Sequence, residues 1–146
     1  MSKHESITLA QTHHIRDSCL CLHVQRAALV IARRFDDALR PFDLTNGQFS
    51  LLVSLNRPDP ARMAAVASLL AVDRTTLTAN LKPLARRGLL KTAIDKADRR
   101  SRTIALTPKG RKLIRDAYPV WQRTHDVQEK RLSSPARLRA DLLALG

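Results

Sequence analysis

Residues 95–111 read DKADRRSRTIALTPKGR, and this stretch decides the fold. Its first half carries three arginines within four positions, and Asp98 is the only acid directly beside them. The segment RTIAL that follows is rich in residues that favour a β-strand. TPKG then begins a helix, because Thr107 is suited to the N-cap and Pro108 to the first helical position, where its missing N–H costs nothing. The order predicts a charged loop, a strand and a helix.

The residues before this stretch predict a partner strand and a pair of short helices. LLKTAI, residues 89–94, favours a second strand, which places the arginines at the tip of a hairpin. One short helix is predicted over residues 61–71, and another begins after Asp73, a strong N-cap, and ends before Gly88. Two short helices joined by a tight turn, with Thr, Asn, Lys and Arg concentrated in the second, are typical of a helix-turn-helix.

Longer helices are predicted toward both ends of the chain. Residues 18–40 place apolar side chains at steps of three and four, a stripe made of Cys21, Val24, Ala28, Ile31, Phe35 and Ala38. Other helices are expected over residues 45–56, from Pro108 to about Arg131, and after a cap at Ser133 or Ser134. The apolar residues expected to point inward from the second and third helices are Phe49, Leu52, Val53, Leu55, Met63, Val66, Leu69 and Leu70.

These elements predict one domain, residues 1–146, with a mainly α fold and a small β-hairpin wing. A winged helix-turn-helix lobe is expected over residues 45–107. It lies between helical regions at residues 1–44 and 108–146, whose amphipathic helices exceed what a compact monomer of this length needs, so we expect them to form a dimer.

The formal net charge of +13 is concentrated in one part of the chain. Residues 74–115 hold thirteen Lys or Arg against two acids. Such a concentration attracts polyanions, and no helix combines it with bulky apolar anchors, so the sequence favours a nucleic acid over a membrane as partner. The longest apolar run, residues 64–72, is too short to span a bilayer. Residues 1–18 contain no apolar block of a signal peptide, and a cytoplasmic location is expected.

The second helix of the helix-turn-helix has the composition of a DNA-reading helix. Small polar side chains on its exposed face allow a close approach to base edges, while Leu77, Leu81 and Leu84 form its buried side. The candidate DNA contacts are Arg74, Thr75, Thr76, Thr78, Asn80 and Lys82. Asn80 either reads an adenine or bonds within its own helix, and the sequence leaves both interpretations open.

The hairpin tip supplies three further candidate DNA contacts, Arg99, Arg100 and Arg102. An arginine at this place is suited to a narrow minor groove, where the negative potential is enhanced. The alternative is a solvated charge run. The excess of Lys and Arg over acidic residues around the hairpin favours contact with DNA.

Three segments together resemble the MarR (multiple antibiotic resistance regulator) family of transcription factors: LTNGQFSLLVSL at residues 44–55, DRTTLTANLKPLARRGLL at 73–90, and the stretch at 95–111. The resemblance covers nearly the whole chain, and the third segment is the most specific. It implies a homodimer with interlocked terminal helices that binds double-stranded DNA at a pseudo-palindrome. It also implies that Arg100 enters the minor groove and that Asp98 holds the loop.

The resemblance further implies an effector that releases the DNA, and two kinds remain open. A small aromatic acid or phenol is the default of the family, with His23, Phe49, Arg115 and Trp121 as candidate lining residues. Cys21 aligns with the reactive cysteine of the organic hydroperoxide regulators in this family. Gln25 and Phe35 stand where those proteins place tyrosines, and a reactive thiolate needs a donor or cation beside it. The aromatic ligand is therefore favoured, and Cys21 is equally well interpreted as a small buried hydrophobe.

The sequence favours neither an enzyme nor a metal or cofactor site. It contains no Gly-rich phosphate loop, paired carboxylates on one helix or Ser-His-Asp arrangement. Cys19, Cys21 and His23 are spaced for a strand, so on a helix they cannot share a metal ion. The predicted function is a sequence-specific DNA-binding repressor. A non-specific nucleic-acid packaging protein is the alternative, and a thiol-dependent enzyme using Cys21 is a more remote one.

Overall fold

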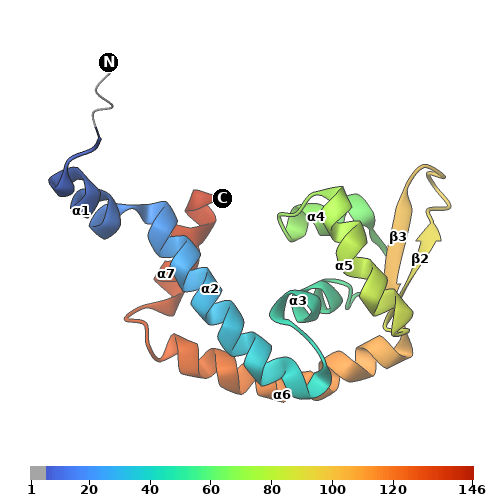
Figure 1. Ribbon diagram of the computed structural model, residues 1–146. Helices are drawn as coiled ribbons and strands as arrows, with labels where there is room; N and C mark the ends of the chain where they lie inside the picture. Colours follow the sequence, from blue (N-terminus) through green and yellow to red (C-terminus); the bar gives the residue numbers. More distant parts are fainter. Residues whose placement is uncertain (1–5) are drawn as a thin grey trace.

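The computed structural model describes residues 6–146, and it has a mainly helical fold with a small sheet far from the N-terminus (Figure 1). Residues 1–5, which belong to the predicted helical region 1–44 and to the segment 1–18 searched for a signal peptide, lie outside the described residues. The elements are α1 (Leu9–Ser18), α2 (Leu20–Leu39), the 3-10 helix η1 (Arg40–Phe42), α3 (Asn46–Ser54), β1 (Ala61–Arg62), α4 (Met63–Leu69), α5 (Arg74–Arg86), β2 (Leu90–Ile94), β3 (Arg102–Leu106), α6 (Pro108–Glu129) and α7 (Pro135–Leu145). The predicted fold class is confirmed.

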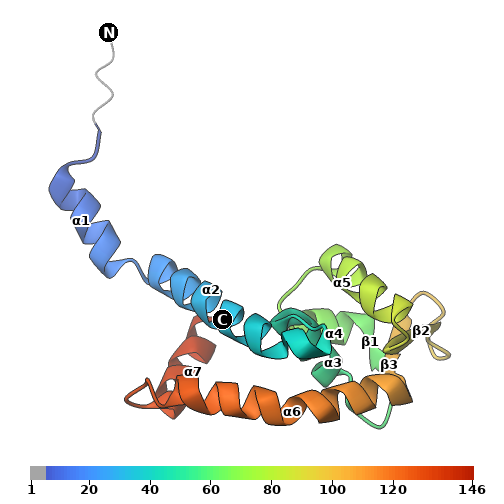
Figure 2. The same cartoon turned by 60° about the horizontal axis from the view of Figure 1, so that its bottom comes forward.

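The N-terminal helices differ from the single helix predicted over residues 18–40. α1 begins earlier, at a capping box in which Thr8 and Gln11 bond reciprocally. Cys19 adopts an extended backbone and ends α1, and its sulfur accepts the N–H of Leu22 at the start of α2. α2 therefore begins at Leu20, with Cys19 as its N-cap, two residues after the predicted start at residue 18. α1 and α2 follow one another with a bend between them (Figure 2).

The segment from α3 to β3, residues 46–106, is called the winged lobe below. The helix predicted from residue 45 is capped by Thr45, and the predicted cap at Asp73 is present. Gly88 follows α5 with a positive φ of 72°. The predicted hairpin is present as β2 and β3. Residues 61–62 form a short strand rather than the start of a helix, because they pair with β3 in a three-stranded sheet of order β1-β3-β2.

The core lies mainly in the winged lobe and is built from leucines. Its largest fully buried side chains are Leu39, Leu51, Leu52, Leu55, Leu77, Leu84, Leu89 and Ile104. Two residues predicted to point inward do not: Val53 is 45% exposed and Leu69 is 70% exposed. In α3, Leu51 is buried instead of Val53, and three helices, α2, α4 and α6, contact this short helix.

The first turn of α6 is bonded to the end of α5. The backbone N–H of Thr107 donates to the carbonyl of Leu89 (3.1 Å), and its hydroxyl donates to the carbonyl of Gly88 (2.6 Å). A Cβ at Gly110 would lie 2.0 Å from the carbonyl oxygen of Leu89, so only glycine fits there. From this attachment α6 extends beneath the lobe to α2 and α7 (Figures 1 and 2).

The terminal helices α1, α2 and α7 contribute little to the core of the chain. α1 and α7 contain no buried residue, and α2 contains only Leu39. Their exposed large apolar side chains are Leu9, Ile15, Leu20, Leu22, Val24, Leu29, Val30, Ile31, Leu138, Leu142, Leu143 and Leu145. This surface is far more apolar than that of a helix bathed in solvent on all sides.

Candidate nucleic-acid interface

The exposed side of α5 divides into a central row and two flanks. At 100° per residue, Thr75, Ala79, Lys82 and Arg86 fall within about 60° of one another, and all four are exposed. Leu77, Leu81 and Leu84 are buried on the opposite side, as predicted. Arg86 was not among the predicted contacts, although its spacing of four from Lys82 places it on the same row.

One flank of α5 faces the wing across a cleft of about 330 Å³. Its lining brings together the predicted contacts Arg74, Thr78, Lys82 and Arg102. The hydroxyl of Thr78 donates to the backbone carbonyl of Arg74 (2.8 Å), so its hydrogen is already used within the helix. Its methyl group and hydroxyl oxygen remain available for a contact.

The other flank of α5 faces the N-terminal end of α3. Asn80 lines a hollow there together with Gln48 and Pro83. Thr76 lies on the same side by helical spacing, and its backbone N–H donates to the cap residue Asp73 at 2.6 Å. This bond is the main reason that the pKa of Asp73 is lowered. Asn80 is thus displaced from the central row, at a place where base contact requires the helix to sit deep in a groove.

The wing presents its arginines on a loop ordered by Asp98. Its carboxylate accepts the backbone N–H of Arg100 and the hydroxyl of Ser101, each at 3.0 Å. This is the supporting role that the resemblance implies for Asp98. Arg99, Arg100 and Arg102 are exposed, and none of the ion pairs within residues 6–146 includes them. Their charges are therefore free to meet phosphates.

The predicted effector residues fall into two groups. Phe49 and Trp121 stack with ring centroids 6.4 Å apart, and Trp121 also meets Phe35, Tyr118 and His125. The described structure does not bring Cys21 and His23 to this cluster, because Cys21 precedes Phe35 by fourteen residues, or about 21 Å along α2. Arg115 is exposed on α6.

Cys21 is exposed in the single chain, so the interpretation as a buried hydrophobe is wrong within one chain. The side-chain amide of Gln25 donates to its sulfur at 3.3 Å. Nδ1 of the neighbouring His23 donates a hydrogen bond to the carbonyl of Cys19 (2.7 Å). Among residues 6–146 no group of three His, Cys, Asp or Glu is placed to hold a metal ion.

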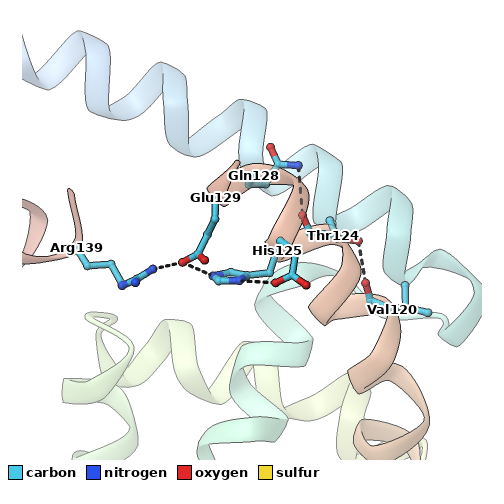
Figure 3. Close-up of polar contacts among 7 residues, drawn as sticks. Val120, Thr124, His125, Gln128, Glu129 and Arg139 are labelled. Atoms are coloured by element: carbon cyan, nitrogen blue, oxygen red, sulfur yellow. Dashed lines mark hydrogen bonds and ion pairs between the residues drawn. The ribbon is translucent and has the colours of Figure 1, made fainter. Parts of the chain in front are cut away.

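Polar contacts that sequence reasoning missed connect the terminal helices. Figure 3 shows His125 of α6 and Arg139 of α7 both directed at Glu129, with His125 Nε2 3.6 Å from the carboxylate. The bond from Arg139 is the main reason that the pKa of Glu129 is lowered. Arg34 of α2 donates to Gln128 at 2.6 Å. Arg34 and Gln128, like Glu129 and Arg139, lie on different helices, so no periodicity within one helix indicates these pairs. His125 and Glu129 are four residues apart on α6, a spacing that the sequence does show.

Within residues 6–146, no helix has both the length and the apolar character to cross a bilayer.

Comparisons with known proteins place the chain among transcription regulators. Residues 44–110 match the family described as winged helix DNA-binding domain. The HTH-type transcriptional regulator TtmR of Methylorubrum extorquens (strain PA1) is 36% identical over 97 residues, which are 66% of this chain. The chain spans half the length of that relative.

Solved structures match over most of their length. The M. tuberculosis transcriptional regulator MosR in complex with DNA is 36% identical, with a TM-score of 0.81 over 88% of this chain and 93% of that one. A mutant MarR from E. coli complexed with operator DNA shares the fold, with a TM-score of 0.77 at 21% identity over 89% and 94% of the two chains. These relatives are regulators and not enzymes, in agreement with the sequence prediction that this chain is not an enzyme.

Proposed function

The chain belongs to the MarR family of winged helix-turn-helix transcription regulators, and from this premise we propose that it binds a pseudo-palindromic operator as a homodimer and acts as a repressor. Each α5 would enter a major groove, and each wing would reach the adjacent minor groove. The proposed location of this activity is the cytoplasm.

The observation that carries this proposal is that basic side chains without an acidic partner converge on one surface. Arg74 and Lys82 of α5 line the same cleft as Arg102 of the wing, and Arg99 and Arg100 extend from the loop beyond it. The central row of α5 adds Thr75 and Arg86. A helix with small side chains toward its N-terminal end, flanked by arginines, supports base reading together with phosphate binding.

The exposed apolar face of the terminal helices supports the homodimer. A two-fold arrangement would place two winged lobes about one helical turn of DNA apart, which suits a pseudo-palindrome. We assign residues 1–44 and 108–146 to this dimerisation region, with residues 45–107 as the DNA-binding lobe.

Release by a small aromatic ligand is the proposed form of regulation. Trp121 is half-buried, lies beside Phe35 and Phe49, and belongs to α6, the helix of the dimerisation region that directly follows the lobe. A planar ligand that inserts beside this ring would change the packing between α2 and α6. Thiol oxidation at Cys21 is the second candidate, favoured by the exposure of that thiol and by its bond from Gln25.

Footprinting on the promoter region of the chain's own gene tests the DNA-binding proposal. A regulator should protect one pseudo-palindromic site, and protection of DNA along its whole length would instead indicate the packaging alternative.

The two effector candidates are separated by titrating the protein–operator complex with phenolic acids and with hydroperoxide. We expect a phenolic acid to release the DNA and hydroperoxide to have little effect. Release by hydroperoxide that is lost in Cys21→Ser but kept in Cys19→Ser would reverse this assignment.

A further inference from the structure

Asp95 is a nearly buried carboxylate at the root of the wing. Its side chain is 12% exposed, and its Oδ1 accepts the backbone N–H of Ala97 at 3.0 Å. Its Oδ2 is buried and lacks a hydrogen bond of ordinary geometry within residues 6–146, while Nε of Arg62 lies 3.1 Å from it. A carboxylate removed from water needs a compensating charge, and Arg62 supplies it.

The register of the sheet explains how residues 33 positions apart meet. Arg62 on β1 lies opposite Thr103 on the central strand β3, and Thr103 lies opposite Ala93 on β2. Asp95 follows Ala93 by two positions and so shares its face. The Arg62 side chain therefore reaches across β3 to the end of β2 and ties the two outer strands of the sheet together.

The bonds continue from this ion pair to the loop that carries the arginines. The backbone N–H of Asp95 donates to the carbonyl of Ser101 at 3.0 Å and closes the root of the loop. Ser101 in turn bonds to Asp98, which also holds the N–H of Arg100. An uninterrupted series of contacts thus runs from Arg62 to the backbone of Arg100.

We propose that Arg62 and Asp95 form a wing brace that positions the wing for DNA, with Arg62 acting through Asp95 as a positioning residue. This inference rests on the proposed function. The competing explanation is that Arg62, whose side chain is 61% exposed, touches a phosphate itself. The two explanations make opposite statements about Asp95, because a direct phosphate contact gains nothing from a carboxylate beside it.

The test measures operator affinity by fluorescence anisotropy over a range of salt concentrations for Arg62→Gln, Asp95→Asn and the double variant. If the brace acts as a unit, each single variant raises Kd about tenfold and the double variant is no worse than either. The dependence of affinity on salt stays that of wild type, because no phosphate contact is lost. Arg62→Lys, which keeps the charge, recovers part of the loss.

A direct contact gives a different result. Arg62→Gln would then reduce the salt slope by about one charge, and Asp95→Asn would leave affinity unchanged or improve it. Either observation overturns the brace.

A readout that needs no DNA separates failure of the brace from failure of the proposed function. Amide hydrogen exchange at Ala97, Arg100 and Ser101 should become faster in both single variants, while exchange in α5 stays unchanged. Unchanged exchange at the wing overturns the brace even if wild type binds its operator. Faster exchange in variants of a protein that recognises no operator would retain the ordering by Arg62 and reject the regulator.

Discussion

The winged lobe and the terminal helices satisfy their apolar side chains in different ways. The lobe contains almost the entire core, and leucines of α3 and α5 are fully buried within one chain. α1 and α7 bury no residue, and the first three turns of α2 are exposed on all sides. With Leu39 of α2 and Ile114 and Ala117 of α6, the lobe therefore buries its apolar side chains within one chain. The terminal helices instead carry an apolar surface that a second copy of this chain would cover.

Ile31→Glu should have the largest effect, because it tests the apolar surface of the terminal helices. Ile31 lies on the apolar stripe of α2, so a dimer would place two carboxylates in an apolar interface, each at a cost of about several kcal/mol. We expect sedimentation to give a mass near 16.4 kDa for this variant at micromolar concentration and twice that for wild type. Arg33→Glu, on the opposite side of α2, serves as control and should remain dimeric. A wild-type protein that sediments as a monomer would show that no second copy covers the apolar surface of the terminal helices.

Leu84→Ala should produce the next largest effect, this time on the winged lobe. Leu84 is fully buried on the inner side of α5, and the cavity left by its truncation should cost about 2–5 kcal/mol of unfolding free energy. Leu69→Ala is the matched control, since the exposed Leu69 should change this free energy by less than about 0.5 kcal/mol. Urea denaturation at one protein concentration measures both. Similar losses in the two variants would mean that the lobe does not hold its own core.

Arg100→Ala tests the functional surface of the lobe and should leave its fold intact. We expect operator binding to weaken by about 1–3 kcal/mol and the salt slope to fall by about one charge. Lys112→Ala should cost much less, because Lys112 lies on α6 and is paired with Asp116. Equal losses for the two variants on the same operator fragment would show that the wing stays outside the groove.

The smallest effect concerns the joint between the two regions. Asp36 of α2 accepts the backbone N–H and the side-chain amide of Asn46 at 2.7 and 2.8 Å, and these bonds lower its pKa. A carboxyl whose folded pKa is depressed stabilises the fold above its unfolded pKa, and this stabilisation is lost as the pH falls through the folded pKa.

Asp36→Ala should therefore lower the unfolding free energy by about 1 kcal/mol at pH 7. Thermal unfolding of wild type and variant should converge as the pH falls below about 4. The exposed neighbour Asp37 provides the control substitution, Asp37→Ala. A difference between wild type and Asp36→Ala that grows on acidification would exclude this account of the joint.

Sequence reasoning succeeded where structure depends on nearby residues. The caps at Thr45, Asp73 and Thr107, the glycine after α5 and the β2–β3 hairpin follow from local propensity, and all are present. The basic surface was also predictable, because charge needs no tertiary contact to be counted.

Most of the failures involve contacts between distant segments, whereas the start of the N-terminal helix was missed on local grounds. β1 is a strand only because it pairs with β3 about forty residues later, and the Arg62–Asp95 pair depends on that register. Val53 and Leu69 fit the apolar spacing of short helices, for which periodicity alone cannot decide the buried face. His23 and Trp121 were grouped as lining residues of one ligand site, yet His23 precedes Phe35, which meets Trp121, by twelve positions of continuous helix.

The close contact at Gly110 fixes the start of α6 to the winged lobe, so a change in the direction of α6 moves the lobe with it. No residue with a Cβ fits at Gly110, and Thr107 bonds to Gly88 and Leu89, which follow α5. We therefore expect α5 and α6 to turn as one rigid piece. The 22 residues of α6 span about 33 Å, and a tilt of about 5° at one end of such a rod displaces the other by about 3 Å. That displacement is close to the rise of one base pair, about 3.4 Å. A ligand that alters the angle of α6 by a few degrees would thus shift α5, the recognition helix, by about one base pair along the DNA, without any change inside the lobe.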